Sequence, residues 1–153
     1  MRRAGTFLLR SYWCADARCP LQSVTMQGDG DRDSPNILVV EDDEDAREAM
    51  VALLQMKGYR VVPAGNGREA LDYLDQGPPP DLIILDLWMP VMDGWQFRSE
   101  QTRNPRLAHI PVIVVTALAD RADVDANDVI IKPVDVDRLL IKVDQYCRRE
   151  PTP

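Results

Sequence analysis

Residues Asp81–Gly94 read Asp-Leu-Ile-Ile-Leu-Asp-Leu-Trp-Met-Pro-Val-Met-Asp-Gly. The apolar run Leu82–Leu85 shows no alternation, which predicts a strand buried on both faces of a parallel sheet. The run ends on Asp86, and a loop with Pro90 and Gly94 follows at once. Ligands of open parallel sheets bind at the carboxyl ends of strands, so Asp86 is a candidate site residue. Asp also commonly starts turns, and this single strand end leaves that alternative open.

Apolar runs and helical periodicity alternate along the chain from Asn36 onward. The pattern predicts five strands, at Ile37–Val40, Arg60–Val62, Leu82–Leu85, Ile110–Val115 and Val129–Ile131. It predicts helices after Asp43, after Asn66, over Trp95–Arg103 and from about Asp135, with Gly58 closing the first and Asn66 with Glu69 starting the second. This alternation predicts an α/β fold of right-handed βαβ units, with a parallel sheet covered on both faces.

Polar residues follow four of the five predicted strands. If all strands point the same way, one edge of the sheet collects Glu41, Asp42, Asp86, Thr116 and Lys132. Three carboxylates so close together repel one another unless a cation joins them. Oxygen ligands without His or Cys favour a hard ion, and Mg²⁺ is the first expectation.

A lysine and a hydroxyl beside a metal-bound carboxylate form a pocket for an anion with several oxygens, and phosphoryl is the natural candidate. The chemistry that fits is attack by the Asp86 carboxylate on phosphorus to give an acyl phosphate. Lys132 and the Thr116 hydroxyl can supply positioning and charge neutralisation. No general base is needed, because a carboxylate is ordinarily ionised at neutral pH.

These residues resemble the receiver domains of two-component response regulators, over about Asn36–Cys147. The resemblance rests on four motifs in order: Val39-Val40-Glu41-Asp42, then Asp86 with Met89-Pro90 and Asp93-Gly94, then Thr116-Ala117, then Lys132-Pro133. It implies a flavodoxin-like, doubly wound, five-stranded sheet of order 2-1-3-4-5.

The resemblance also implies roles for single residues. Asp86 would accept a phosphoryl group from a histidine kinase or phosphotransfer protein, and Lys132 and Thr116 would contact that group. Mg²⁺ would be bound, directly or through water, by Glu41, Asp42, Asp86 and the main-chain carbonyl of Trp88. The Lys132-Pro133 bond would be cis. Such a domain is no classical enzyme but a phospho-acceptor that assists its own phosphorylation and slow autodephosphorylation, signalling to a downstream protein or along a phosphorelay.

Two features depart from the family pattern. Val129 stands where the family usually has an aromatic residue, three positions before the lysine. The connection between Thr116 and Lys132 is several residues shorter than usual and poor in apolar residues, so we expect a shortened fourth helix. Bulky Trp88 and Leu118 near the pocket could shield an acyl phosphate from water, or could simply pack there.

Composition limits the other possibilities. A chain of 153 residues suits one domain. A formal net charge of -7 argues against binding nucleic acid. No apolar run reaches the roughly 18 residues of a membrane span. The cysteines Cys14, Cys19 and Cys147 match no zinc spacing and fit unpaired thiols in a reducing cytoplasm. The lone histidine, His109, is expected to be structural or solvated.

The chain divides into three parts. We expect a disordered N-terminal extension over residues 1–35, which ends in a Gly- and Asp-rich linker and could lie upstream of a start at Met26. Residues 36–149 form the expected receiver domain and residues 150–153 a tail. Because so few residues follow Tyr146, we expect a cytoplasmic receiver without an output domain.

Three alternatives remain at this point. A pseudo-receiver would use the same fold only for docking, and Val129 with the shortened connection favours it. A dinucleotide-binding domain is suggested by Gly65–Ala70, which fits G-x-G-x-x-A after a strand, but it leaves Lys132 without a role. An aspartyl phosphatase would need a second acid two residues after Asp86, where Trp88 stands.

Overall fold

A computed structural model describes residues 34–117 and 124–147. The strands are β1 (Asn36–Val40), β2 (Arg60–Ala64), β3 (Leu82–Asp86), β4 (Val112–Thr116) and β5 (Asp128–Ile131). The helices are α1 (Glu44–Met56), α2 (Gly67–Gln76), α3 (Gly94–Arg103) and α4 (Val136–Cys147).

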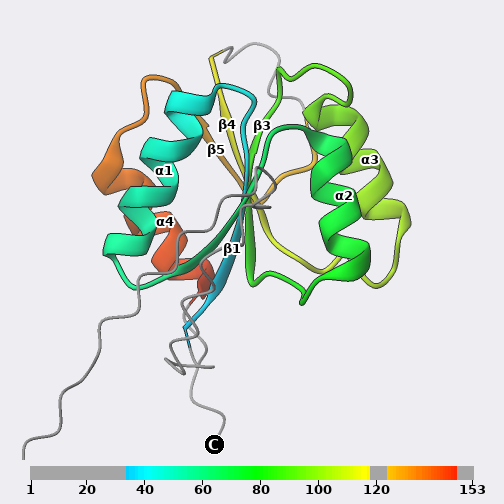
Figure 1. The fold of residues 1–153 in the computed structure, drawn as a ribbon, viewed down its shortest axis with the longest axis horizontal. Helices are drawn as coiled ribbons and strands as arrows, with labels where there is room; N and C mark the ends of the chain where they lie inside the picture. The colour runs from blue at the N-terminus through cyan, green and yellow to red at the C-terminus, as the bar shows by residue number, and fades with distance from the viewer. Residues whose placement is uncertain (1–33, 118–123, 148–153) are drawn as a thin grey trace, which may run out of the picture. The chain divides into compact units, whose positions relative to one another are not determined.

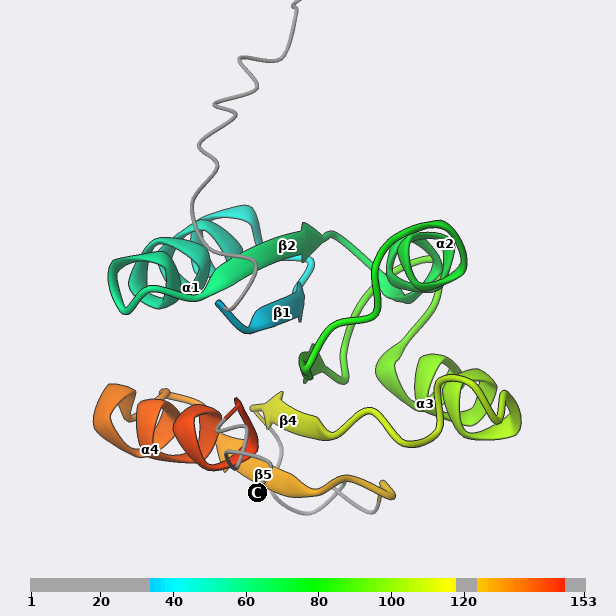
Figure 2. The same cartoon turned by 90° about the horizontal axis from the view of Figure 1, so that it is seen from below.

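All neighbouring strands run parallel, in the order β2-β1-β3-β4-β5. Helices α1 and α4 cover one face of the sheet and α2 and α3 the other (Figures 1 and 2). The predicted doubly wound sheet of order 2-1-3-4-5 is therefore confirmed. Parallel strands place all their carboxyl ends at one edge, which is where the candidate site residues were expected.

The central strands carry the core. Every residue of β1, β3 and β4 is buried, as the uninterrupted apolar runs predict for strands covered on both faces. Alternate residues pack into two separate clusters: Leu38 and Val40 lie with α2 and α3, whereas Ile37 and Val39 lie with α1 and α4. The strand ends are therefore held by packing from both sides.

Local signals set the helix ends. Asp43 caps α1 by accepting the Ala46 amide at 2.8 Å, and Gly58 follows α1 with φ 89°, a left-handed conformation that favours glycine. Asn66 caps α2 as predicted. The Glu69 carboxylate accepts from the Gly65 amide and from Asn66 Nδ2, instead of the Asn66 amide of a standard capping box.

Several predicted strand boundaries differ from the observed ones by one or two residues. Strand β4 begins at Val112 and not at Ile110, because the intervening Pro111 has no amide to pair and only its carbonyl accepts a bond, from the Ile83 amide. Strand β5 begins at Asp128, one residue earlier than predicted, and β2 extends to Ala64.

The expectation of a shortened fourth helix is consistent with the described part of the β4–β5 connection, where neither Ala117 nor residues 124–127 are helical. The remaining residues of that connection, 118–123, lie outside the described residues. So do almost all of the predicted N-terminal extension, the predicted tail, Leu118, Cys14 and Cys19.

Candidate functional site

Four strand ends meet at one edge of the sheet. Glu41 and Asp42 directly follow β1, Asp86 ends β3, Thr116 ends β4 and Lys132 follows β5. Glu41 and Asp86 are almost fully buried, at 3% and 6% exposure, although both carry carboxylates. Buried carboxylates need partners, because burial alone disfavours the charged form.

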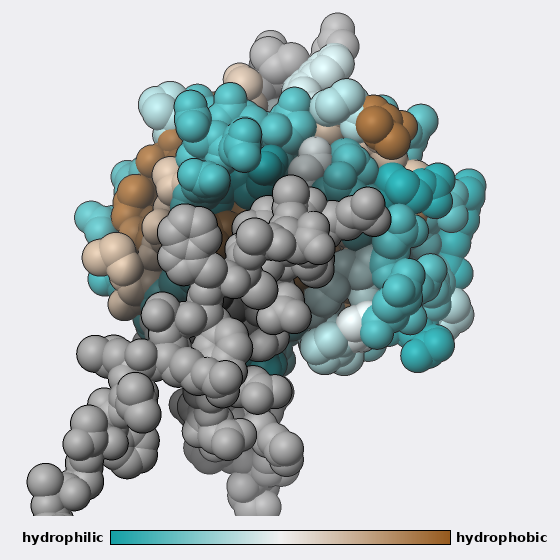
Figure 3. All heavy atoms as spheres, in the orientation of Figure 1, coloured by the Kyte–Doolittle hydropathy of each residue, from teal (hydrophilic) through white to brown (hydrophobic). Residues whose placement is uncertain are grey.

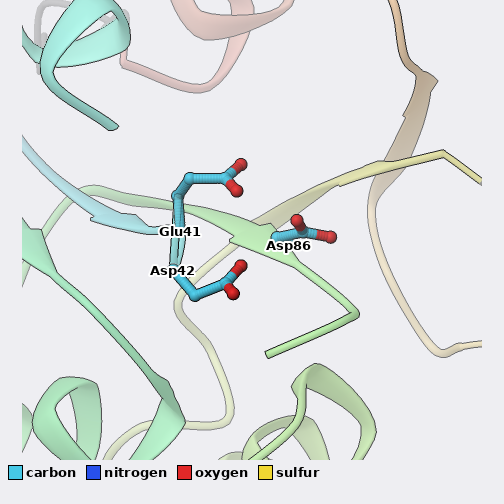
Figure 4. A group of neighbouring side chains, drawn as sticks. All are labelled: Glu41, Asp42 and Asp86. Atoms are coloured by element: carbon cyan, nitrogen blue, oxygen red, sulfur yellow. The ribbon is translucent and has the colours of Figure 1, made fainter. Parts of the chain in front are cut away.

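The three carboxylates converge. Glu41, Asp42 and Asp86 each offer an oxygen within 4.8 Å of the others. Figure 4 shows the side chains of Glu41 and Asp42 extending from the end of β1 toward Asp86 at the end of β3. Asp43, the third acid of the run, is used instead as the cap of α1. The predicted acidic cluster is therefore present, and its all-oxygen donor set fits a hard divalent cation.

Lys132 joins two of these carboxylates. Its Nζ lies 2.8 Å from Glu41 Oε2 and 2.8 Å from Asp86 Oδ2. Its amide donates to the Thr116 carbonyl at 2.8 Å, which fastens the residue after β5 to the end of β4. The Lys132-Pro133 bond is cis, as the resemblance implied. One lysine thus offsets part of the negative charge of the cluster.

The electrostatics follow from burial and from these contacts. Burial raises the pKa of Glu41 above its ordinary value, and the nearby Asp86 carboxylate raises it further, against the opposing hydrogen bond from Lys132. Burial alone would lower the pKa of Lys132, but its hydrogen bonds to Asp86 and Glu41 outweigh burial and raise it. The lysine therefore stays cationic, while added positive charge would favour the ionised form of Glu41.

Thr116 and Trp88 flank the acidic cluster. Thr116 is fully buried at the end of β4. The Trp88 amide donates to Asp86 Oδ1 at 3.2 Å, while its side chain is 48% exposed and meets Trp95 edge to face, with ring centroids 5.4 Å apart. The amide contact orients the Asp86 carboxylate, and the half-exposed indole packs against α3 through Trp95.

The β3–α3 loop is held closely. The Gly94 amide donates to the Leu87 carbonyl at 3.0 Å, and the Gly67 amide donates to the Met92 carbonyl at 3.1 Å. A Cβ added at Gly67 would lie 2.7 Å from Met92 Cγ. Close packing of α2 against this loop therefore explains Gly67, the second glycine of the G-x-G-x-x-A pattern, whereas Gly65 lies beside Glu69 and Arg47.

An apolar groove of about 420 Å³ opens beside the site, between α1 and α4. Figure 3 shows apolar side chains gathered at the α1 and α4 side of the molecule, whereas the α2 and α3 side is mainly hydrophilic. Glu41 and Lys132 contribute to the lining of the groove together with Met50, Leu53, Val134 and Leu139. The groove therefore leads directly to the charged cluster.

The sequence matches the response regulator receiver domain over residues 37–144. The chain belongs to this receiver family of two-component systems. It is 37% identical over 118 residues to an uncharacterized 14.6 kDa protein of Leptolyngbya boryana, covering 73% of this chain and 89% of that protein. The chain spans only about half the length of the next curated relatives that it matches.

Solved structures agree. The signal receiver domain of a histidine kinase from Syntrophus aciditrophicus is 34% identical, with a TM-score of 0.70 over 78% of this chain and 98% of that one. The response regulator TrrA of Thermotoga maritima, solved with Mg²⁺ and BeF, is 33% identical, with a TM-score of 0.66 over 73% of this receiver and 98% of that chain.

Sequence reasoning missed one residue of this region. Arg47, the fourth residue of α1, donates from Nη1 to the carbonyls of Glu41 and Asp42. No spacing rule singles it out, because a basic residue in the first turns of a helix usually faces solvent. None of the helices in the described ranges has the length and apolar character needed to cross a membrane.

Proposed function

We propose that this receiver accepts a phosphoryl group on Asp86 from a histidine kinase or a histidine phosphotransfer protein. The observation that carries the proposal is the convergence of the Glu41, Asp42 and Asp86 carboxylates with Lys132 in direct contact. A structural role alone would not require three acids and one lysine from separate strand ends at one edge of the sheet.

The transfer needs little covalent machinery from the protein. An oxygen of the Asp86 carboxylate attacks phosphorus, the bond between phosphorus and the donor imidazole nitrogen breaks, and the electron pair leaves with the imidazole. Lys132 exchanges a carboxylate contact for the phosphoryl oxygens, and the Thr116 hydroxyl donates to another of them. Catalysis then consists of positioning and charge neutralisation, and no general base takes part.

Mg²⁺ fits the donor set. Glu41, Asp42, Asp86 and the main-chain carbonyl of Trp88 would hold it, directly or through water. When bound, the ion supplies charge neutralisation at the carboxylates and at the incoming phosphoryl oxygens. The raised pKa of Glu41 agrees with a carboxylate cluster that gains from added positive charge.

The protein would act as a switch and not as a turnover enzyme. Asp86 would be its phospho-acceptor, with slow autodephosphorylation, and the signal would pass by conformational change or along a phosphorelay to a downstream protein. The half-exposed Trp88 side chain would hinder water at the acyl phosphate. The groove between α1 and α4 supports a protein donor, since it ends at Lys132 and Glu41.

The setting of the domain is also part of the proposal. We assign the folding unit to residues 36–149, with residues 1–35 as an extension and residues 150–153 as a tail. We assign the protein to the cytoplasm, and its formal net charge of -7 disfavours binding to nucleic acid or to an anionic membrane through this domain. Limited proteolysis with mass analysis tests the boundaries: a stable fragment near residues 36–149 is expected.

A pseudo-receiver that docks without phosphorylation is the second candidate. Val129 favours it, because the family's usual aromatic residue at this position changes its side-chain rotamer together with the threonine during signalling, and a valine lacks that aromatic ring. The two candidates differ in whether the acid cluster is used for chemistry.

The deciding experiment uses acetyl phosphate and Mg²⁺, followed by intact mass. The parent protein is expected to gain one phosphoryl group and Asp86→Asn none. Labelling of both proteins moves the acceptor elsewhere, and labelling of neither favours the pseudo-receiver.

A further inference from the structure

Arg47 braces the backbone that carries the acidic pair. Its Nη1 lies 2.8 Å from the Glu41 carbonyl oxygen and 3.3 Å from the Asp42 carbonyl oxygen. These carbonyls belong to the two residues whose carboxylates face Asp86. One guanidinium on α1 is thus bonded to the main chain of both.

The choice of acceptor is selective. Arg47 follows five consecutive acidic residues, 41–45, yet within the described ranges it forms no ion pair and bonds to main-chain carbonyls instead. An arginine that paired with Glu41 or Asp42 would compete with a cation for their oxygens. Bonding to the carbonyls leaves the carboxylates available and fixes the loop that presents them.

The guanidinium is confined by a neighbouring turn. A Cβ added at Gly65 would lie 3.8 Å from Arg47 Nη1, so the group sits beside the turn between β2 and α2. On that side the Glu41 amide donates to the Ala64 carbonyl at 3.1 Å. The Glu41–Asp42 backbone is therefore held by β2 through Glu41 and by α1 through Arg47.

We propose that Arg47 is a positioning residue for the metal ligands, acting through the backbone of Glu41 and Asp42. The inference rests on the proposed Mg²⁺-dependent function and adds a residue to it. Two effects of Arg47 oppose each other: its positive charge disfavours a nearby cation, whereas its hydrogen bonds hold the ligands in place. Positioning is the larger effect, so removing Arg47 weakens Mg²⁺ binding although it also removes a positive charge.

The test compares the Mg²⁺ dissociation constants of the parent, Arg47→Met, Arg47→Lys and the control Arg60→Met, by calorimetry. Arg47→Met keeps the side-chain stem and removes the donors, and about tenfold weaker binding is expected. Arg47→Lys keeps the charge and can reach one carbonyl, so about threefold weaker binding is expected. Arg60 is the first residue of β2 and pairs with Asn36, at the end of the sheet opposite the site. Its replacement removes the same charge and is expected to leave the Mg²⁺ dissociation constant unchanged.

The possible outcomes separate the claims. Parent protein that fails to bind Mg²⁺ overturns the proposed function together with this inference. Parent protein that binds Mg²⁺ while Arg47→Met binds equally well or more tightly overturns only the role of Arg47, because charge would then dominate. If Arg47→Met does not fold, Arg47→Lys decides: affinity equal to that of the parent contradicts positioning.

A second readout excludes a general loss of stability. Amide exchange of residues 41–43 in the metal-free protein is expected to be faster in Arg47→Met than in the parent, with unchanged exchange in β4. Faster exchange throughout the protein would mean that Arg47 is merely structural and would overturn the proposal.

Discussion

The connections that follow β3 and β4 are built in different ways. The β3–α3 loop, residues 87–93, is held mainly by bonds to neighbours close in sequence, such as the Trp88 amide to Asp86 and the Gly94 amide to Leu87, with one distant bond from the Gly67 amide to the Met92 carbonyl. The described end of the β4–β5 connection, residues 124–127, is held by distant elements. The first loop is thus encoded mainly by local contacts, whereas the described end of the second depends on the completed fold.

The distant contacts come from three elements. Arg98 of α3 donates from Nε to the Asp125 carbonyl and from Nη1 to Gln101 Oε1 at 2.9 Å. Asn127 exchanges two bonds with Val112 of β4, and its carbonyl accepts from the Tyr146 hydroxyl of α4. The connection therefore ends in a polar anchor that joins α3, β4 and α4.

The largest expected effect concerns the locally encoded loop. A Cβ added at Gly94 would lie 2.5 Å from the Asp86 carbonyl oxygen and 2.8 Å from Leu87 Cα. Both are backbone atoms, so relieving the clash requires the main chain to shift. Gly94→Ala is expected to lower the free energy of unfolding by roughly 2–4 kcal/mol and to impair phosphorylation, because the end of β3 must move. Urea unfolding measures the change, with the exposed Gln96→Ala as control. Equal stability of the two variants would show that the loop is looser than the contacts indicate.

The next effect concerns the polar anchor. Arg98→Met leaves Gln101 and the Asp125 carbonyl without their donor, and we expect a loss of about 1–3 kcal/mol in unfolding free energy. Faster amide exchange at residues 124–127 should accompany it. The control is Arg103→Met, since Arg103 forms only an exposed pair with Glu100 and its loss should cost at most about 0.5 kcal/mol. An unchanged exchange rate in Arg98→Met would contradict anchoring by α3.

A smaller effect depends on pH. The hydrogen bond from Tyr146 to Asp128 raises the pKa of Tyr146 from 10.0 to about 12, because that bond stabilises the protonated phenol. The stabilisation of the folded state by Tyr146 is therefore complete below pH 10 and is lost as the pH rises from 10 toward 12. Urea unfolding across this range should show a falling free energy of unfolding in the parent and a weaker fall in Tyr146→Phe. At neutral pH the substitution should lower the free energy of unfolding by about 0.5–1 kcal/mol. The same decline in both proteins would assign it to other groups.

The smallest effect returns to the β3–α3 loop. Val91 has φ 70° and the Met92 amide bonds to the Pro90 carbonyl at 2.8 Å, so a β-branched residue occupies the centre of a tight turn in the left-handed region. Its side chain is 81% exposed and contributes little packing. Val91→Gly should raise the free energy of unfolding by about 0.5 kcal/mol, the strain relief exceeding the entropy cost of glycine. Val91→Ala keeps the Cβ and should gain less; a Gly variant less stable than the parent would show that the strain is absent.

The sequence predicted what depends on short patterns. The buried runs of β1, β3 and β4 and the polar residues at their ends follow from unbroken apolar stretches, and Gly58 and Asn66 mark helix ends by local backbone chemistry. The family resemblance supplied the sheet order.

Contacts between distant segments were not predictable. Arg98 and Gln101 are buried in α3, although polar residues usually face solvent. Arg98 bonds to the carbonyl of Asp125 from a distant segment, and Gln101 bonds to the carbonyls of Leu107 and Ile110 in the connection that follows the helix. Likewise, only the folded structure shows that Lys132 bridges Glu41 to Asp86 and that Arg47 reaches the Glu41 carbonyl. Tertiary packing decides which groups become partners in this way, and no fixed spacing in the sequence predicts these contacts.

The most direct test of the assembled site is to locate the acyl phosphate. Protein treated with acetyl phosphate and Mg²⁺ is reduced with borohydride, which converts an aspartyl phosphate to homoserine, and its peptides are then sequenced by mass spectrometry. We predict homoserine at position 86 and at no other acidic residue, with none when Mg²⁺ is removed by chelation. Homoserine at another position, or its absence from position 86 in the presence of Mg²⁺, would contradict the role of the Glu41, Asp42, Asp86 and Lys132 cluster.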